Sequence, residues 1–245
     1  MDRVAFNLFG IDIMWYGILI TLGMILAIII STREAKRVGY SENYIIDLSM
    51  FLITFGVIGA RAYYVLFNWD YYTANISQII NIRGGGLAIH GGIIAGAVTV
   101  YIFSKIKKLD FFKLTDIVLL GVPLAQSIGR WGNFINGEAH GGPTDLPWGI
   151  IVDSQKVHPT FLYESIWNLF IFIIIFRNRK NKKYEGALLV QYLFLYSLGR
   201  FFIESMRTDS LMIGSLRAAQ IVSLIGIVLS IILHIVLLKR SKDGI

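Results

Sequence analysis

Residues 118–142 read VLLGVPLAQSIGRWGNFINGEAHGG and join an apolar run directly to the densest group of polar residues in the chain. The first part, residues 118–128, has the composition of a membrane span. The second part, residues 129–142, sets five polar side chains among five glycines. These side chains are Arg130, Asn133, Asn136, Glu138 and His140. Much of the remaining chain is apolar, so the place of this group relative to lipid determines what it can act on.

The overall composition is that of a membrane protein. Hydrophobic residues make up 55% of the 245 residues, charged residues make up 16%, and the mean hydropathy is +0.63. Several runs approach the ~20 apolar residues that a helix needs to cross a hydrocarbon layer of ~30 Å. The expected spans are 14–32, 44–67, 87–104, 112–129, 159–176, 187–206 and 216–238. Because backbone in lipid must satisfy its own hydrogen bonds, we expect an all-α integral membrane protein, a seven-transmembrane-helix bundle. Residues 1–245 show no linker or convincing repeat, so a single domain is expected.

Basic residues predict the orientation of these spans. Fifteen of them fall on one side of an alternating seven-span map. They are Arg33, Lys36, Arg37, Lys105, Lys107, Lys108, Lys113, Arg177, Arg179, Lys180, Lys182, Lys183, Lys239, Arg240 and Lys242. Cytoplasmic loops carry an excess of Lys and Arg, so the N-terminus is predicted outside and the C-terminus in the cytoplasm. Span 14–32 is not expected to be a cleaved signal peptide, because its positive charges follow the apolar run. The net charge of +7 is then mostly a topology signal, and no nucleic-acid partner is expected.

The other basic residues are mostly arginine. They are Arg3, Arg61, Arg83, Arg130, Lys156, Arg200, Arg207 and Arg217. These residues lie outside or within spans, where positive-inside sorting tends to deplete basic side chains. The planar guanidinium grips phosphate or carboxylate at two points, which the lysine ammonium cannot do. The excess of arginine over lysine among these residues predicts an anionic ligand at the outer face.

Polar residues of different spans fall at one depth on this map. The outer ends of the spans hold Tyr16, Arg61, His90, Gln126, Arg130, Tyr163, Glu164, Tyr196, Arg200 and Glu204. The last three recur every four residues and so share one face of a helix. Ionisable residues inside a membrane are expensive and mark functional sites. Arg200 and Glu204 could instead form a structural pair, and Tyr16 could be an interfacial aromatic. Their common depth favours a shared site in the outer leaflet.

Two glycine-framed segments are expected to be loops that let backbone approach a ligand. The first is GGGLAIHGG, residues 84–92, which holds His90, and the second is residues 129–142. Glycine permits turns whose N–H groups form anion-binding nests. The chain lacks the P-loop, HExxH and GxSxG motifs, and its four histidines lack metal-ligand spacing, so no metal and no cofactor are expected. Because the chain contains no cysteine, a thiol that takes part in the chemistry must come from the substrate.

The segment GRWGNFINGE, followed by Gly141, resembles the signature G-R-x-G-N-F-x-N-x-E-x-x-G of bacterial prolipoprotein diacylglyceryl transferases. Other segments agree with that family along nearly the whole chain. They are WYG at 15–17, GARAYYVLFNWDYY at 59–72, GGLAIHGG at 85–92, HPTFLYES at 158–165 and GRFFIESMRTDS at 199–210. Seven spans with an outer N-terminus also fit, although the outer-face loops, 68–86 and 130–158, are rather short.

This resemblance implies an enzyme of the bacterial cytoplasmic membrane that acts in the first step of lipoprotein maturation. Such an enzyme moves the diacylglyceryl group of phosphatidylglycerol onto the lipobox cysteine of a prolipoprotein signal peptide and releases glycerol-1-phosphate. Its implied partners are phosphatidylglycerol, prolipoprotein signal peptides and membrane lipids. Matching motifs imply that the substrate is bound by Tyr16, Arg130, Asn133, Asn136, Glu138, Gly141, Tyr196, Arg200 and Glu204. The implied catalytic residues are His90, Arg130 and Arg200.

The expected roles follow from the chemistry of these side chains. Arginine donors in a low-dielectric site stabilise the charge that grows on a departing phosphate, a role expected of Arg130 and Arg200. The attacking thiol is mostly protonated at neutral pH and needs a base, and His90 suits that task. Asn133 and Asn136 are expected to orient the donor headgroup. Glu204 is expected to hold Arg200, and Glu138 to order its loop or to orient His140 or an arginine.

Two other classes of protein remain alternatives from the residues alone. A transporter for an anionic solute would also show polar residues within helices and glycine-broken segments. In this chain, however, the polar residues concentrate in the outer half, and no ionisable ladder continues inward. A non-catalytic lipid-binding scaffold would need anion recognition but no base, so His90 would be replaceable.

Overall fold

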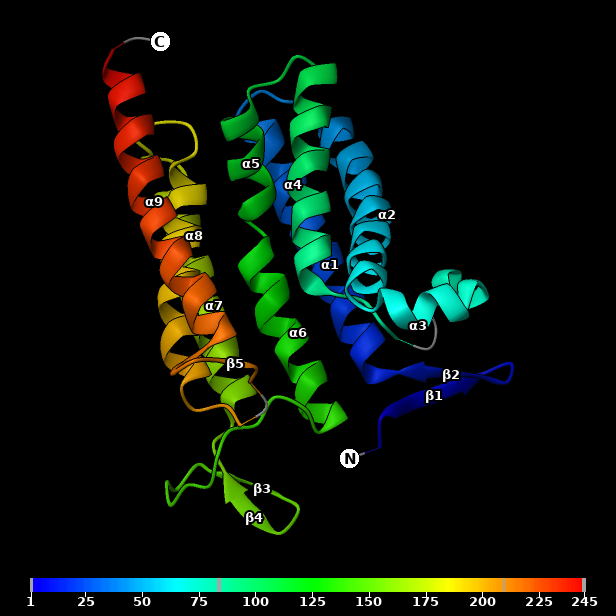
Figure 1. Ribbon diagram of the computed structural model, residues 1–245. Coiled ribbons are helices and arrows are strands. Elements are labelled where there is room, and N and C mark those ends of the chain that lie inside the picture. The colour runs from blue at the N-terminus through cyan, green and yellow to red at the C-terminus, as the bar shows by residue number, and fades with distance from the viewer. Residues whose placement is uncertain (1, 83–84, 209, 244–245) are drawn as a thin grey trace. The chain divides into compact units, whose positions relative to one another are not determined.

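The computed structural model describes residues 2–82, 85–208 and 210–243 (Figure 1). Arg83 and Gly84, at the start of the first glycine-framed segment, lie outside these described residues. The chain divides into two compact units. The larger unit joins the residues up to Ser31 with those from Asp116 onward, and the smaller unit comprises Thr32–Thr115.

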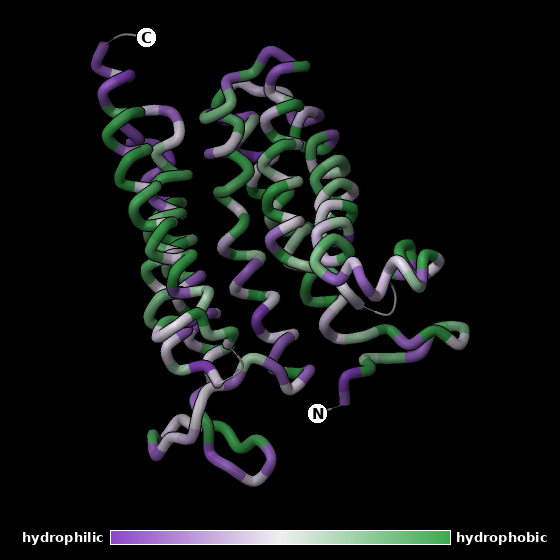
Figure 2. Tube along the Cα trace, in the orientation of Figure 1, coloured by the Kyte–Doolittle hydropathy of each residue, from purple (hydrophilic) through white to green (hydrophobic). Residues whose placement is uncertain are grey.

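Seven helices among the described residues are long and apolar enough to cross a membrane. They are α1 (Trp15–Arg37), α2 (Glu42–Phe67), α4 (Ile89–Ile106), the pair α5 and α6 (Phe111–Asn136), α7 (Thr160–Asn178), α8 (Ala187–Glu204) and α9 (Ala218–Lys242). Figure 2 shows apolar residues along these helices and hydrophilic residues gathered towards their ends. The mostly helical structure and the number of apolar spans are therefore confirmed. Their orientation and their packing in one bundle stay predictions.

The fourth span consists of two helices, α5 (Phe111–Leu119) and α6 (Val122–Asn136). Pro123 has no N–H to donate to the carbonyl of Leu119, so the helix is interrupted between them. At the interruption, Gly121 packs against α1, where a Cβ atom would lie 2.5 Å from the Cα of Ala27. This close contact explains why a residue without a side chain stands there.

Helix α6 ends at Asn136 rather than at the predicted residue 129. The expectation that residues 129–142 form a loop is therefore wrong for residues 129–136. Gly132 lies within the helix and faces α1, where a Cβ atom would lie 2.6 Å from a ring carbon of Tyr16. Gly137 adopts the left-handed conformation, with φ of 74°, and caps the helix. A high glycine content here reflects helix packing as well as a turn.

His90 also stands on a helix rather than in the expected loop, because α4 begins at Ile89. The two glycines that follow His90 are helical. Gly91 faces α2, where a Cβ atom would lie 2.2 Å from the carbonyl oxygen of Gly59. Positive φ angles are confined to Gly85 and Gly86 among the described glycines of this segment. The loop is thus shorter than predicted, and His90 occupies the first turn of α4.

The larger unit is a sequence of neighbouring helices, in which α6 packs on α7, α7 on α8 and α8 on α9 (Figure 1). Its most buried cluster consists of Leu120, Ile171, Ile175 and Leu188. Three short antiparallel hairpins complete it. They are β1 (Val4–Leu8) with β2 (Ile11–Met14), β3 (Ile150–Val152) with β4 (Gln155–Val157), and β5 (Met212–Ile213) with β6 (Leu216–Arg217). This packing supports the ends of α6, α7 and α8, which carry the polar residues described below.

The smaller unit is built on the contact between α2 and α4. Between these two helices the chain forms α3 (Trp69–Ala74) and the 3-10 helix η1 (Ile76–Ile80). The segment then returns through Gly85 and Gly86 to the start of α4. Its two long helices come closest at Gly59 and Gly91, where neither residue has a side chain to separate them.

Asp116 of α5 caps the N-terminus of α8, about 70 residues later in the chain. Its carboxylate is 1% exposed and accepts hydrogen bonds from the backbone N–H groups of Gly186, Leu188 and Leu189 at 2.9–3.1 Å. Lys182 Nζ lies 3.1 Å from the same carboxylate. Burial alone lowers the pKa of Lys182, but its bonds to Glu185 and Asp116 outweigh burial and raise the pKa above its usual value. Lys182 therefore remains the charged partner of Asp116.

Replacing Asp116 with alanine is expected to destabilise the protein by about 3–5 kcal/mol, because it leaves buried N–H donors and a buried ammonium without their acceptor. Asp110→Ala is the matched control. Asp110 also caps a helix, accepting from Lys113 N at 2.7 Å, but it is exposed, and its loss is expected to cost about 1 kcal/mol. Thermal unfolding in detergent measures both variants. Equal shifts of Tm would contradict the proposed importance of the buried cap.

Candidate functional site

Five ionisable side chains of the larger unit form one network, here called the arginine–glutamate cluster. Its members are Arg130 of α6, Glu164 of α7, Arg200 and Glu204 of α8, and Arg207 just after α8. They come from three consecutive helices, each contributing a residue at the end nearest the polar hairpins and turns. The sequence periodicity of α8 accounts for part of the network, since residues four apart share a helix face.

Glu164 is the centre of this cluster. Its Oε2 atom lies 2.6 Å from a terminal nitrogen of Arg130, and its Oε1 atom lies 2.7 Å from one of Arg200. Arg207 approaches Oε1 at 3.4 Å. A single carboxylate therefore contacts three guanidinium groups and holds the side chains of α6 and α8 at a fixed separation.

Glu204 forms the second anionic contact. Its Oε2 atom lies 2.7 Å from Arg200 and 3.9 Å from Arg207, while Ser210 Oγ donates to Oε1 at 2.6 Å. The two terminal nitrogens of Arg200 thus bridge two different carboxylates. The contact with Glu164 is a hydrogen bond, whereas the contact with Glu204 Oε2 is an ion pair without hydrogen-bond geometry.

The cations of the cluster are more exposed than its anions. Three guanidinium groups contact its two carboxylates. The side chains of both glutamates are 4% exposed, whereas those of Arg130 and Arg200 are 21% and 20% exposed. Buried anions therefore orient partly exposed cations, which is an arrangement suited to binding an anion.

Polar residues at the end of α6 continue the site. Arg130 donates to Asn133 Oδ1 at 3.5 Å, and the side-chain amides of Asn133 and Asn136 each donate to Glu138 at 3.4 Å. Glu138 therefore accepts hydrogen bonds from the two side-chain amides of its own turn, which agrees with the expected role of ordering that turn. The structure brings together Arg130, Asn133, Asn136 and Glu138 from the motif of residues 129–142.

Gly141 lies where three segments of the chain meet. Its N–H donates to the carbonyl of His158 at 2.8 Å, and a Cβ atom would lie 2.7 Å from both His158 Cβ and the carbonyl oxygen of Met206. At Gly142, by contrast, the nearest atom would be 3.7 Å away, on Thr208. The neighbouring atoms therefore leave no room for a side chain at Gly141, which pairs with Arg207.

Gly141→Ala is expected to reduce the activity proposed below by about 10-fold or more, because displacing the neighbouring segment displaces Arg207 by a fraction of an ångström to an ångström. Gly142→Ala is the matched control, since its Cβ atom meets an ordinary van der Waals contact. The initial transfer rates of the two variants, measured at equal protein concentration, test this expectation. Equal rates would show that the contact at Gly141 is not needed.

Two tyrosines of the predicted site also belong to the larger unit. Tyr16, in the first turn of α1, packs on Gly132 of α6. Tyr196 stacks on Tyr192, with ring centroids 5.5 Å apart, and the Tyr192 hydroxyl donates to Gln126 Oε1 at 3.1 Å. Both tyrosines therefore border α6 and α8, the helices that carry Arg130 and Arg200.

His90 belongs to the smaller unit. It is exposed in the first turn of α4, and its ring centroid lies 6.0 Å from that of Tyr63. The meeting of His90 with the arginine–glutamate cluster stays a prediction.

Sequence reasoning gave too little weight to Glu164 and Arg207. Both appear in matched motifs, HPTFLYES and GRFFIESMRTDS, and Glu164 falls at the common depth of the polar residues. A signal was therefore present, but it could not show that one carboxylate contacts three arginines. That property depends on how α6, α7 and α8 pack.

Comparison with known proteins adds an independent observation. A family model described as prolipoprotein diacylglyceryl transferase matches residues 3–236. A protein of Clostridioides difficile named phosphatidylglycerol–prolipoprotein diacylglyceryl transferase is 63% identical over 245 residues, which cover 100% of this chain and 99% of that protein. Proteins with the same name from Finegoldia magna and Geobacillus kaustophilus are 54% and 48% identical, over 96% and 99% of this chain and 95% and 94% of their own lengths.

Proposed function

Because the chain belongs to the prolipoprotein diacylglyceryl transferase family, we propose that it transfers the diacylglyceryl group of phosphatidylglycerol to the lipobox cysteine of prolipoproteins. The observation that carries this proposal is the arginine–glutamate cluster, whose partly exposed guanidinium groups suit the phosphate of an anionic lipid. The absence of cysteine from the chain agrees with a thiol that arrives on the substrate.

We propose that the reaction takes place at the outer face of a bacterial cytoplasmic membrane. The seven apolar helices and the family together indicate a multi-pass membrane protein. Basic residues in the last turns of α1, α7 and α9 support an inner position for those ends, and hence an outer N-terminus and a cytoplasmic C-terminus. The arginine–glutamate cluster lies near the first turn of α7 and the last turn of α8, away from the basic end of α7. On this orientation the cluster lies in the outer leaflet.

The chemical step forms one bond and breaks one. The cysteine sulfur attacks the glycerol carbon that bears the phosphate, and the bond between that carbon and the phosphate oxygen breaks. Glycerol-1-phosphate leaves with the electron pair, and a thioether remains. Arg130 and Arg200 contact the phosphate and stabilise the charge that grows on it, in a site whose arginines are already oriented by Glu164 and Glu204.

The remaining residues of the proposed site bind or orient the lipid donor. Asn133 and Asn136 face the headgroup oxygens, with Glu138 holding their amides. Tyr16 stands in the first turn of α1, and Tyr196 stands on α8, four residues before Arg200. Gly141 allows the backbone around His158 and Met206 to pack closely. These roles combine the motif match with the contacts of the larger unit.

His90 is proposed to accept the thiol proton. His90→Gln is expected to lower kcat by about 10²–10⁴-fold, the usual contribution of general base catalysis, and to remove the histidine limb from the pH–rate profile. His140→Gln is the matched control, because His140 stands at a free position of the family motif and its Nδ1 lies 3.4 Å from the Gly141 carbonyl oxygen. An unchanged profile in His90→Gln would exclude His90 as the base.

A direct assay tests the proposed function as a whole. The purified protein is incubated with phosphatidylglycerol and a lipobox peptide, and mass spectrometry follows the peptide. The expected product carries the added mass of one diacylglyceryl group, and a peptide with serine in place of cysteine should remain unmodified. No mass gain under conditions in which a known family member works would overturn the proposal.

A further inference from the structure

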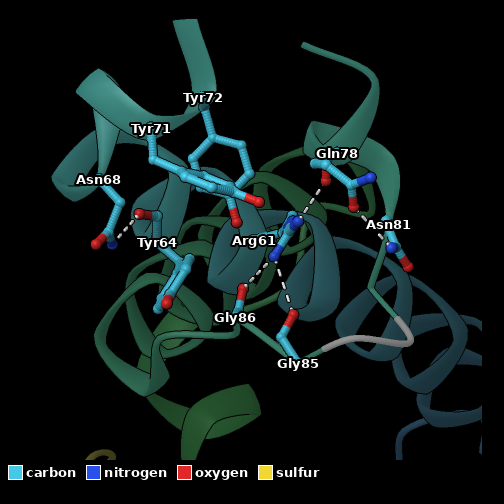
Figure 3. A pocket seen from close by; sticks show the side chains of 9 residues that line it. All are labelled: Arg61, Tyr64, Asn68, Tyr71, Tyr72, Gln78, Asn81, Gly85 and Gly86. Atoms are coloured by element: carbon cyan, nitrogen blue, oxygen red, sulfur yellow. Dashed lines mark hydrogen bonds between the residues drawn. The ribbon is translucent and has the colours of Figure 1, made fainter. Parts of the chain in front are cut away.

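Arg61 of α2 is a buried arginine outside the arginine–glutamate cluster. It is 8% exposed and borders a cavity of about 320 Å³ in the smaller unit. Figure 3 shows its guanidinium pointing towards the returning segment before α4, with Tyr64 and Tyr72 beside it. Its central carbon lies 5.1 Å from the ring centroid of Tyr72 and 5.9 Å from that of Tyr64.

The guanidinium of Arg61 donates hydrogen bonds to four backbone carbonyls. Arg61 Nε donates to Ile79 O at 2.8 Å, and one terminal nitrogen donates to Gly85 O and Gly86 O at 2.9 and 2.8 Å. The other terminal nitrogen donates to Gln78 O at 2.6 Å. A guanidinium has five N–H donors, so these four bonds leave little capacity for a ligand. The contacts instead join both ends of the segment between η1 and α4.

The same part of α2 contacts the start of α4. Ala88 N donates to the carbonyl of Ala60 at 3.0 Å, and Gly91 lies directly on Gly59. His90 stands between these two contacts and lies beside Tyr63. Residues 59–63 of α2 therefore contact the backbone on both sides of His90 and also its ring.

We propose that Arg61 is a positioning residue for the transfer reaction, which fixes the backbone at residues 78–79 and 85–86 and thereby the entry of α4 that carries His90. This inference rests on the proposed function and extends it. Arg61 acts through backbone carbonyls and does not touch substrate. A buried guanidinium bound to carbonyl dipoles is a costly way to order a loop, and a lysine cannot replace it, because one ammonium cannot span carbonyls on both sides of the segment.

Arg61→Lys is therefore expected to lower kcat by about 10- to 100-fold with little change in KM for either substrate, because a small misplacement of a reacting group suffices for such a loss. In a His90→Gln background, Arg61→Lys is expected to have little further effect, since residues that act through one group are non-additive. Arg33→Lys, at an exposed arginine of the same unit, should leave the rate unchanged. A raised KM, or an equal loss with and without His90, would overturn the proposal.

A pair of glycine variants tests the same contact without removing Arg61. Gly85 and Gly86 both have positive φ, at 89° and 76°, so alanine is strained at either position. Only at Gly86 would the Cβ atom meet Arg61, 2.3 Å from a terminal nitrogen, whereas at Gly85 nothing lies within 4 Å. Gly86→Ala should reproduce the loss of Arg61→Lys, and Gly85→Ala should lose less. Equal losses would assign the effect to backbone strain and overturn the proposal.

Loop mobility provides a readout that is independent of catalysis. The chain contains no cysteine, so Ile80→Cys, at a residue 85% exposed, accepts a single nitroxide label. Its spectrum should show greater mobility in Arg61→Lys and Gly86→Ala than in the parent or Gly85→Ala. Unchanged mobility would overturn the bracing role. If the parent protein transfers no diacylglyceryl group, the proposed function fails and the catalytic role of Arg61 fails with it, while the mobility comparison still decides whether Arg61 orders the segment.

Discussion

The variants Arg130→Ala and Arg200→Ala are each expected to lose about 10²–10³-fold or more in kcat, the effect of removing a preorganised donor to a developing anion. Both side chains are partly exposed cations held by the buried carboxylate of Glu164. Either substitution removes a donor to phosphate, and it also leaves Glu164 with fewer cationic partners in a buried position. The two effects act in the same direction, so the loss should be large.

Transfer of labelled lipid to a lipobox peptide measures this loss, with membrane insertion checked separately. Arg3→Ala, at an exposed arginine of the same unit, is the matched control and should remain active. Arg200→Lys should also be severely impaired, because the two terminal nitrogens of Arg200 contact Glu164 and Glu204, both at 2.7 Å. Near-full activity in the alanine variants would remove the cluster from the mechanism.

Replacing Glu164 with glutamine is expected to lower both stability and activity. The amide keeps the shape of the side chain but removes the negative charge and one acceptor that faces arginine. The cluster would then hold three guanidinium groups against the single carboxylate of Glu204. Breaking a buried ion pair in this way is expected to destabilise the protein by about 3–5 kcal/mol, and loss of arginine alignment should lower kcat by about 100-fold.

Measurements at a temperature well below the Tm of the variant separate these two effects of Glu164→Gln. Glu185→Gln is the matched control, because Glu185 also pairs with a cation, Lys182, but has a side chain that is 43% exposed. Surface pairs of this kind contribute about 0–1 kcal/mol, so both its Tm and its activity should change little. If Glu164→Gln matched Glu185→Gln in both, Glu164 would not be the centre of the site.

The sequence predicted which residues of the larger unit meet better than it predicted their local structure. Arg130, Arg200 and Glu204 were expected at one level from span positions alone. The structure joins Arg130 to Arg200 through Glu164, and Glu204 contacts Arg200. The segment around Arg130 was expected to be a loop because it is rich in glycine. In the structure that part is helical, because Gly132 accommodates Tyr16 of another helix. Glycine content alone does not distinguish a turn from a close contact between helices.

By itself, the sequence determined seven apolar spans and the need for a thiol from outside the chain. These properties are local, since span length and composition follow from the thickness of lipid and are read directly along the chain. The tertiary structure alone decided that Glu164 contacts three arginines and that Arg61 binds the carbonyls before His90. Such contacts join residues far apart in sequence, so they depend on which helix faces meet when the chain packs.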